Sequence, residues 1–211
     1  FSFFNQSLAA EANYQMFWLA LRPLLDGNSD ALARLDLIRE GFGEVMDREI
    51  EAMWASKLGL INYNAQLVNE LVQLMFSSKA DYTILFRQLS ELPEQFAALQ
   101  ESFYVPCPEE LKSKWTNWLQ RWRDEIKTSG NPKETSAAMQ MVNPKYTWRE
   151  WLIVPAYEKA AHADYSLIKE LQAVFSNPYT EQSAELNAKY NRLRPKEYFS
   201  AGGVSHYSCS S

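Results

Sequence analysis

Residues 105–126 read VPCPEELKSKWTNWLQRWRDEI and place three tryptophans, Trp115, Trp118 and Trp122, at intervals of three and then four positions. Because an α-helix has 3.6 residues per turn, this spacing predicts one helix that carries all three indoles on the same face. Pro108 and the two glutamates after it suit the first turn, where proline gives up no hydrogen bond and acids meet the positive end of the helix dipole. We expect this face to pack in a core, and we expect Trp148 and Trp151 to lie in packed interfaces as well.

Two other interpretations of this helix remain open. Lysines and arginines surround the indoles, and a basic aromatic face can stack single-stranded bases. A tryptophan-rich face can also dock a helix of a partner protein. Core packing is favoured because acids on the same helix offset the basic charge. These acids are Glu109, Glu110, Asp124 and Glu125.

The composition narrows the class of protein. The chain has 211 residues, 46% of them hydrophobic, and a formal net charge of −5. This charge argues against a nucleic-acid partner, which needs a concentrated basic face. Two cysteines cannot make a secreted disulfide framework, so a cytoplasmic location is expected. The best membrane candidate, MFWLALRPLL at residues 16–25, is broken by Arg22 and Pro23, so no membrane partner is expected.

Apolar residues recur at helical spacing along almost the whole chain, without sustained strand alternation or a fixed repeat. The predicted fold class is therefore all-α, an irregular helical array. The expected helices are 8–25, 29–58 with a break at Gly41 and Gly43, 64–76, 81–92, 93–104, 108–126, one through Met139, 147–163, 165–175 and 180–190. Residues beyond Arg192 are expected to be irregular.

The domain organisation has two interpretations. The weakly patterned stretch 128–134 suggests two domains, 1–127 and 128–211, but it also fits a long loop within one domain, 1–211. The chain does not begin with methionine, and we interpret it as a piece of a longer protein.

Few residues have the pattern of a catalytic or metal site. The two histidines, His162 and His206, have no cysteine or second histidine at ligand spacing, so neither zinc binding nor a histidine-activated nucleophile is expected. The stretch EGFGE at residues 40–44 contains Gly-Phe-Gly within a helical pattern, which favours a structural role. Three carboxylates near one helix face are interpreted as solvated or ion-paired: Glu44, Asp47 and Glu51.

Motifs in three segments, with the chain's end, carry a resemblance to one family. In residues 142–182, an Asn-Pro-Lys-Tyr stretch precedes an arginine, an alanine-rich helix, an acidic-aromatic step and a Pro-Tyr turn. These positions are Asn143, Pro144, Lys145, Tyr146, Arg149, Asp164, Tyr165, Pro178 and Tyr179. The other two segments contribute Asn5, Gln6, Pro23 and Leu24, and then Asp81, Phe86, Arg87 and Leu89. Together with SCSS at residues 208–211, these motifs resemble the selenoprotein O family, also called the YdiU family.

The resemblance implies a kinase-like enzyme that transfers AMP from ATP to Ser, Thr or Tyr hydroxyls of other proteins, using Mg²⁺ or Mn²⁺. In that family the nucleotide and metal ligands come earlier in the chain. The present residues are then expected to form the rear helices of the kinase-like C-lobe and a helical C-terminal extension. They would include no catalytic, cofactor-binding or metal residue, and their partners would be the upstream kinase-like domain and protein substrates.

The competing interpretation is a stand-alone helical interaction domain or scaffold whose tryptophan-rich face docks a partner. A kinase-like region directly upstream of Phe1 in the reading frame would favour the enzyme, and a start codon there would favour the scaffold.

The resemblance also gives Cys209 a role as a redox-active thiol. Many bacterial members of the family have cysteine at this third-last position. We expect Cys209 to be unpaired in this chain and bridged to an upstream cysteine in the oxidised complete protein; a bridge to Cys107 is the alternative. The sequence departs from the family at Glu150, where asparagine often follows the arginine, and at His206, where a tail dithiol would place its first cysteine.

Overall fold

The computed structural model describes residues 5–127 and 130–199. Within these two ranges the regular elements are helices, and the β pairing is limited to an isolated bridge between Ala80 and Phe103. The predicted all-α class is therefore confirmed, whereas the likeness to the rear helices of a kinase C-lobe stays a prediction. No helix in the described residues is both long enough and apolar enough to cross a membrane.

The chain divides into two compact units, residues 1–54 and 55–211. This division does not test whether 1–127 and 128–211 fold as independent domains, so that boundary stays a prediction.

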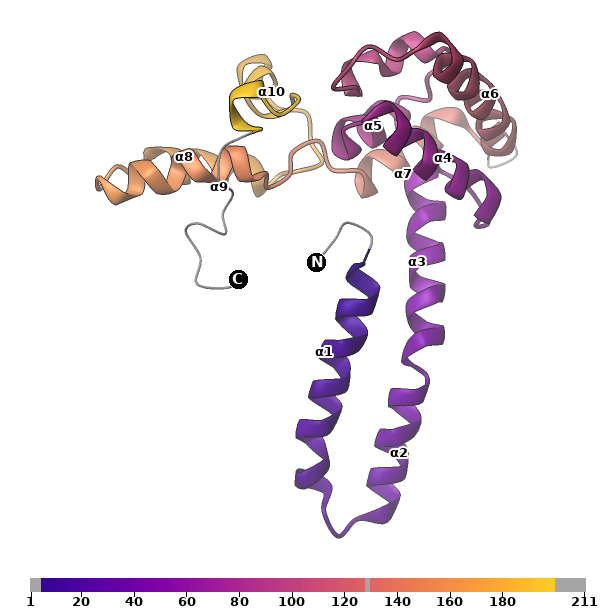
Figure 1. Ribbon diagram of the computed structural model, residues 1–211, viewed down its shortest axis with the longest axis vertical. Helices are drawn as coiled ribbons and strands as arrows, with labels where there is room; N and C mark the ends of the chain where they lie inside the picture. The colour runs from indigo at the N-terminus through magenta and orange to yellow at the C-terminus, as the bar shows by residue number, and fades with distance from the viewer. Residues whose placement is uncertain (1–4, 128–129, 200–211) are drawn as a thin grey trace. The chain divides into compact units, whose positions relative to one another are not determined.

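In the first unit, α1 (Gln6–Leu21) and α2 (Ser29–Glu40) form an antiparallel hairpin (Figure 1). The 3₁₀ helix η1 (Arg22–Leu25) follows α1 at the tip of the hairpin. The next helix, α3 (Phe42–Leu58), begins after a break at Gly41, which confirms the break expected within 29–58.

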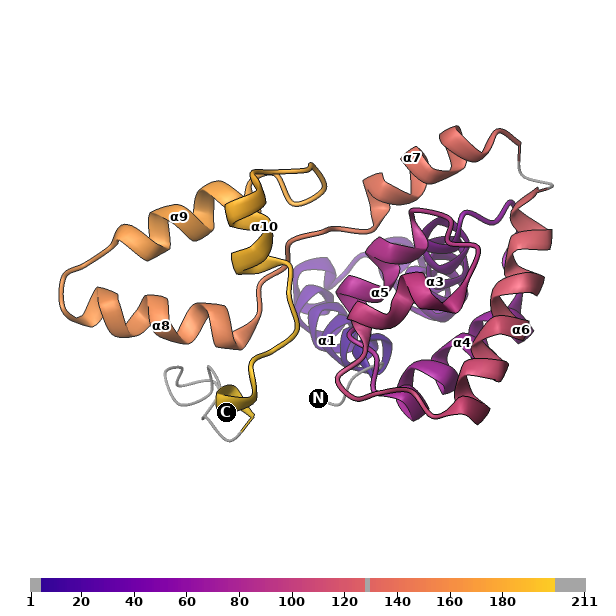
Figure 2. The ribbon, with the colours of Figure 1, turned by 90° about the horizontal axis from the view of Figure 1, so that it is seen from above.

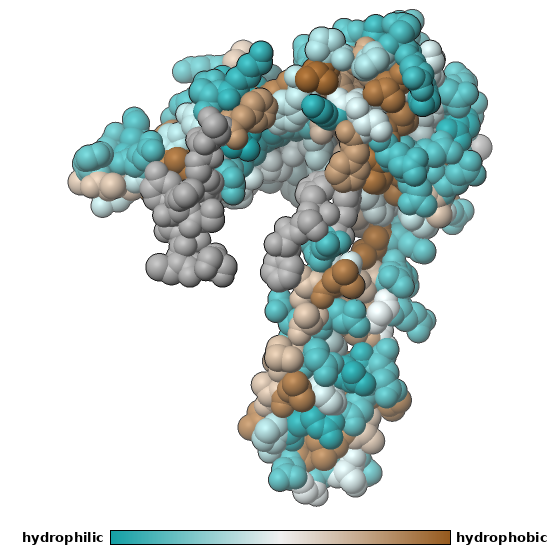
Figure 3. Space-filling view, in the orientation of Figure 1, coloured by the Kyte–Doolittle hydropathy of each residue, from teal (hydrophilic) through white to brown (hydrophobic). Residues whose placement is uncertain are grey.

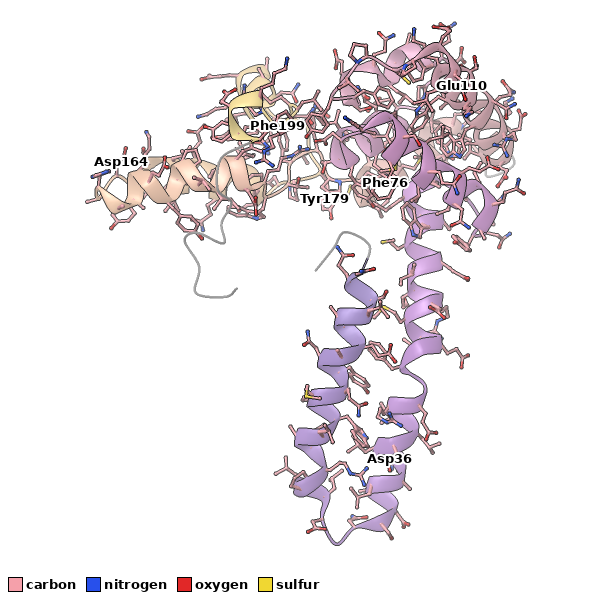
Figure 4. The ribbon with its side chains drawn as sticks, in the orientation of Figure 1. Asp36, Phe76, Glu110, Asp164, Tyr179 and Phe199 are labelled. Carbon is pink, nitrogen blue, oxygen red and sulfur yellow. The ribbon has the colours of Figure 1, made fainter. Side chains whose placement is uncertain are left out.

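A polar cluster joins α1 to α2. The indole N–H of Trp18 donates to Asp36 at 2.9 Å, and Arg22 pairs with the same carboxylate at 2.5 Å. The guanidinium groups of Arg22 and Arg39 both lie over the Trp18 ring, at 4.7 and 4.9 Å from its centroid. Asp36, labelled in Figure 4, therefore holds the hairpin together by polar contacts.

The tryptophan face of α6 (Glu109–Ile126) packs against α4 (Ala65–Ser78) in the second unit. Trp115, Trp118 and Trp122 are all fully buried, which confirms core packing and rules out base stacking on this face. Each indole N–H also has an acceptor: Oγ of Ser78 for Trp115, the carbonyl of Leu67 for Trp118 and the carbonyl of Leu58 for Trp122. Pro108 lies one position before the helix, as its N-cap, and not within the first turn as expected.

The predicted helix 93–104 is wrong. The structure has a 3₁₀ helix there, η2 (Phe96–Ser102), preceded by Leu92 with a positive φ of 53°. Its buried residues Phe96, Leu99 and Ser102 recur at every third position. That interval matches the three-residue turn of a 3₁₀ helix, so burial selects the tighter helix.

Gly59 allows α7 (Pro132–Val142) to approach the end of α3 closely. Its φ is 65°, and a Cβ at this position would lie 2.7 Å from Cγ2 of Thr135 and 2.8 Å from Sδ of Met139. Both the backbone conformation and the space therefore require glycine.

The last helices, α8 (Glu150–Ala161), α9 (Ser166–Phe175) and α10 (Ala184–Tyr190), form a second cluster (Figure 2). The buried residues of this cluster are Tyr146, Trp151, Leu152, Ala156, Leu171, Val174 and Tyr190. Beyond Arg192 there is a short 3₁₀ helix, η4 (Lys196–Tyr198), in a stretch that was expected to be irregular.

The helices predicted at 147–163 and 180–190 begin later in the structure, α8 at Glu150 and α10 at Ala184. Arg149 is extended, with φ of −129°, and α8 starts only at the residue after it. Ser183 caps α10 by accepting a hydrogen bond from the Leu186 amide at 3.3 Å. In both cases a residue before the helix makes a tertiary contact through its side chain: Arg149 pairs with Asp81, and Glu181 pairs with Arg87.

The expectation that Trp148 is buried is also wrong. Its side chain is 60% exposed and rests on the ring of Phe175 at 4.4 Å, whereas Trp151 in the same stretch is 5% exposed. Trp148 lies outside α8, so helical spacing does not place it on the buried face.

Replacing Trp118 by alanine should lower the free energy of unfolding by about 3–5 kcal/mol, because the loss of a fully buried aromatic side chain leaves a cavity and removes the indole hydrogen bond to the Leu67 carbonyl. The matched control, Trp148→Ala, removes one exposed ring contact and should cost about 1 kcal/mol. Denaturant unfolding followed by circular dichroism measures both. Equal losses for the two variants would contradict the assignment of the core.

Candidate functional site: a buried polar junction

Asp81 and Arg149, 68 residues apart in sequence, form a buried ion pair. Nη1 of Arg149 lies 2.5 Å from Oδ2 of Asp81, and Nη2 lies 2.8 Å from Oδ1. The side chain of Arg149 is only 13% exposed and that of Asp81 only 6%. The extended conformation of Arg149 before α8 thus fixes the start of the C-terminal cluster to the N-cap of α5 (Tyr82–Leu89).

The Asp81 carboxylate is fully occupied by donors. Oδ1 also accepts the Ile84 amide at 3.1 Å, which caps α5, and Oδ2 accepts the Tyr104 hydroxyl at 2.8 Å. Burial by itself would raise the pKa of Asp81, but the hydrogen bonds and charge of Arg149 outweigh it and hold the pKa below its usual value. With four donors on two oxygens, Asp81 is a structural anion and is not placed to act as a general base.

Arg87, later in α5, makes a second set of polar contacts. Its Nη1 donates to the carbonyl oxygens of Gln140 and Asn143 at 3.2 and 3.3 Å, and its Nη2 donates to Glu181 at 2.9 Å. Lys145 donates to the second oxygen of Glu181 at 2.5 Å. The hydrogen bonds of Glu181, chiefly that from Lys145, lower the pKa of its carboxyl.

The loop after α9 is tied to the same place through its backbone. The amides of Lys145 and Tyr146 both donate to the carbonyl of Pro178, at 2.8 and 3.2 Å. We call the six polar residues assembled here the polar junction. They are Asp81, Arg87, Asn143, Lys145, Arg149 and Glu181.

Asn143, which is fully buried, connects the polar junction to Lys57 at the end of α3. Nζ of Lys57 donates to Oδ1 of Asn143 at 2.9 Å, and Nδ2 of Asn143 donates back to the Lys57 carbonyl at 2.8 Å. The amine also lies over the rings of Tyr82 and Phe86, at 5.3 and 4.9 Å. Burial lowers the pKa of Lys57 to about 8.

Several residues that carried the sequence resemblance therefore contact α5 or belong to it. Asp81, Arg87, Asn143, Lys145 and Arg149 all belong to the polar junction. Other resemblance residues lie elsewhere: Asn5, Gln6, Pro23 and Leu24 are in the first unit, and Asp164 is at the turn between α8 and α9, where it caps the Ser166 amide.

Sequence reasoning missed Lys57, Tyr104 and Glu181. Each makes its contact across a long separation, from 23 residues for Tyr104 to Asp81 up to 94 residues for Glu181 to Arg87. Glu181 follows the Pro-Tyr turn by two positions, and this turn was the one sequence signal that could have pointed to it.

The other sites named from the sequence give no chemistry here. Cys209 and His206 lie outside the described residues, so the redox role of Cys209 stays a prediction. Cys107 is half-buried before α6, and burial raises the pKa of its thiol. In the part of the chain that the structure describes, no group of three or more His, Cys, Asp or Glu side chains could hold a metal ion. Glu44, Asp47 and Glu51 are exposed.

Comparisons with known proteins place these observations in a family. A family model described as Protein adenylyltransferase SelO matches residues 1–176. The Protein nucleotidyltransferase YdiU of Tolumonas auensis is 32% identical over 182 residues, which are 82% of this chain and 34% of that protein. The protein of the same name from Flavobacterium johnsoniae is 28% identical over 223 residues, covering 100% of this chain and 42% of that protein. The chain thus spans about a third to two fifths of the length of these curated relatives.

Removing either partner of the Asp81–Arg149 pair should lower the free energy of unfolding by about 3–5 kcal/mol, because the other charge stays buried without its partner. Asp81→Ala and Arg149→Ala together should cost clearly less than the sum, so a double-mutant cycle should show strong coupling. The control is Glu110→Ala, which removes an exposed pair with Lys114 and an acid at the start of α6, and should lower stability far less than either of these substitutions. Additive losses for Asp81 and Arg149 would contradict a direct pair.

Lys57 should make stability depend on pH in the alkaline range. Its pKa falls from an ordinary 10.5 to about 8 on folding, so the unfolded chain binds more protons between these values. Stability from this group is therefore complete above pH 10.5 and is lost as the pH falls towards 8. Relative to Lys57→Met, the free energy of unfolding of the parent chain should rise by on the order of 2–3 kcal/mol as the pH is raised from 8 to 10.5.

Denaturant unfolding of both proteins at several pH values from 8 to 10.5 measures this difference. Lys169→Met, which removes an exposed lysine of α9, is the control and should track the parent chain. A difference between parent and Lys57→Met that is constant with pH would show that Lys57 is not desolvated.

Proposed function

The chain belongs to the SelO family of protein adenylyltransferases, and from this membership we propose that it is the C-terminal helical part of an enzyme that transfers AMP from ATP to hydroxyl groups of target proteins. The observation that carries the proposal is the family match over residues 1–176, and relatives named protein nucleotidyltransferase support it. In the proposed reaction a Ser, Thr or Tyr oxygen attacks the α-phosphorus, the bond to pyrophosphate breaks, and the hydroxyl proton leaves.

We propose that the catalytic residues, ATP and Mg²⁺ or Mn²⁺ belong to the part of the enzyme that this chain does not include. Two observations support this. The chain spans about a third to two fifths of the relatives' length. The carboxylates of the polar junction, Asp81 and Glu181, are also both bound to cations. A cytoplasmic location is part of the same proposal.

The first unit supports a role in docking to that other part. From Asn5 to Met53 no described residue is buried, so the hairpin and α3 have no core of their own over this length. Large apolar side chains are exposed instead, and apolar patches are visible along the hairpin (Figure 3). They are Leu8, Met16, Phe17, Leu19, Leu24, Leu37, Ile38, Val45 and Met53. Helices of this kind owe most of their stability to tertiary packing, and an exposed apolar surface of this extent marks an interface.

We propose that the upstream kinase-like domain covers this apolar surface. A second candidate function, a stand-alone scaffold, rests on the same exposed residues, with another protein as the occupant. The Trp face of α6 cannot serve that scaffold, because its three indoles are buried inside the second unit.

The activity is tested with the product of the complete reading frame, incubated with ATP labelled on its α-phosphate and mixed cell proteins. We expect label on protein hydroxyls that depends on Mg²⁺ or Mn²⁺, and no MgATP binding by residues 1–211 alone in calorimetry. Micromolar MgATP binding by this chain would contradict the proposed location of the catalytic centre. Label from the γ-phosphate instead would show a kinase.

The docking surface is tested with Phe17→Glu, at a residue that is 58% exposed in α1. In residues 1–211 alone the substitution should change thermal stability little, because most of the side chain is exposed. In the complete protein it should lower both the melting temperature and adenylyl transfer, because a charge enters an apolar interface. Glu11→Gln, at another exposed position of α1, is the control. Unchanged stability of the Phe17→Glu complete protein would show that α1 is not covered there.

A further inference from the structure

A cleft of about 540 Å³ lies between α5 and α10, with Arg87, Lys145 and Glu181 among its lining residues. Arg192 contributes a third cation to its wall. All of these residues belong to the second unit. The cleft is therefore lined by three charged residues of the polar junction.

The two inner cations and their anion differ in burial. The side chains of Arg87 and Lys145 are only 7% and 10% exposed, whereas the side chain of Glu181 is 63% exposed. Buried cations need an anion beside them, because a charge left unpaired in a protein interior is strongly destabilising. A mostly solvated carboxylate, in contrast, can turn out into water when another anion takes its place beside the cations.

The donors also outnumber the acceptor atoms. Glu181 gives one oxygen to Nη2 of Arg87 and the other to Nζ of Lys145. Nη1 of Arg87 is taken by the carbonyls of Gln140 and Asn143, and Nε of Arg87 is buried without a hydrogen-bond partner. Nε and Nη2 form one edge of the guanidinium, and this edge can bind two oxygens of one anion. Together with Nζ of Lys145, the site therefore has donors for three oxygens, whereas Glu181 supplies two.

We propose that the cleft is a binding site for a phosphoryl group and that Glu181 occupies it in the absence of that ligand. A phosphoryl group has three terminal oxygens, enough for Nε and Nη2 of Arg87 and for Nζ of Lys145 at once. Arg192 lies at the same cleft and adds positive charge, with its guanidinium held over the Trp151 ring at 5.1 Å. The proposal does not depend on the proposed function.

Two other carboxylates limit the affinity. Glu91 and Glu101 also line the cleft, and Glu91 accepts a hydrogen bond from Gln140 at 2.8 Å. Their charge opposes an incoming anion, and Glu181 competes with it directly. The parent chain should therefore bind phosphate weakly, and loss of Glu181 should strengthen binding.

Titration of inorganic phosphate into the parent chain and into Glu181→Ala, followed by calorimetry at constant ionic strength, tests the site. We expect phosphate to bind Glu181→Ala at least about tenfold more tightly than the parent chain. Adding Lys145→Ala to the Glu181→Ala variant should abolish the gain. Glu185→Ala, which removes an exposed carboxylate in the first turn of α10, is the control and should bind as the parent does.

Equal phosphate affinity in the parent chain and Glu181→Ala, or a gain that survives Lys145→Ala, would overturn the proposal. AMP titrated in parallel identifies the source of the phosphoryl group: tighter binding of AMP than of phosphate points to a nucleotide, and equal binding to free phosphate. If Glu181→Ala does not fold, Glu181→Gln, which keeps an acceptor but loses the charge, should show the same gain at smaller size, and its absence would overturn the proposal equally.

Discussion

The buried pair of Asp81 and Arg149 is the contact on which the arrangement of the second unit depends. Taking both charges out of water is unfavourable unless every donor and acceptor is satisfied. Here the carboxylate accepts from Arg149 twice, from the Ile84 amide and from the Tyr104 hydroxyl. One side chain thus starts α5, anchors Tyr104 and sets the point at which α8 begins.

Around this pair, the two clusters of the second unit each have an apolar core, and polar contacts specify how they join. The indoles of α6 fill one cluster, and Trp151 with Tyr146 fills the other. Apolar packing alone would tolerate many relative positions, whereas a bidentate ion pair and the buried Asn143–Lys57 hydrogen bonds tolerate few. The first unit differs, because it has a polar cluster at Trp18 and Asp36 but no buried residue from Asn5 to Met53. The proposed docking of the first unit rests on that difference.

Local pattern and tertiary contact explain which expectations succeeded. Trp115, Trp118 and Trp122 could be placed in a core because their spacing is a property of one helix. Trp148 and the stretch 93–104 could not, because the start of α8 is set by Arg149 reaching Asp81, and η2 is set by burial at every third residue. The resemblance singled out Asp81, Arg87, Asn143 and Arg149 but said nothing of their pairing. Glu181 and Lys57 were missed because a contact across 94 or 86 residues leaves no periodic signal.

Native-state hydrogen exchange on the 211-residue chain, compared with Arg149→Ala, tests most directly whether the buried pair unites the second unit. We expect amides of α5 and α8 to share one opening free energy in the parent chain and to lose protection together in the variant, while amides of α1 and α2 exchange fast in both. Loss of protection confined to α8, or slow exchange throughout α1 and α2, would contradict this.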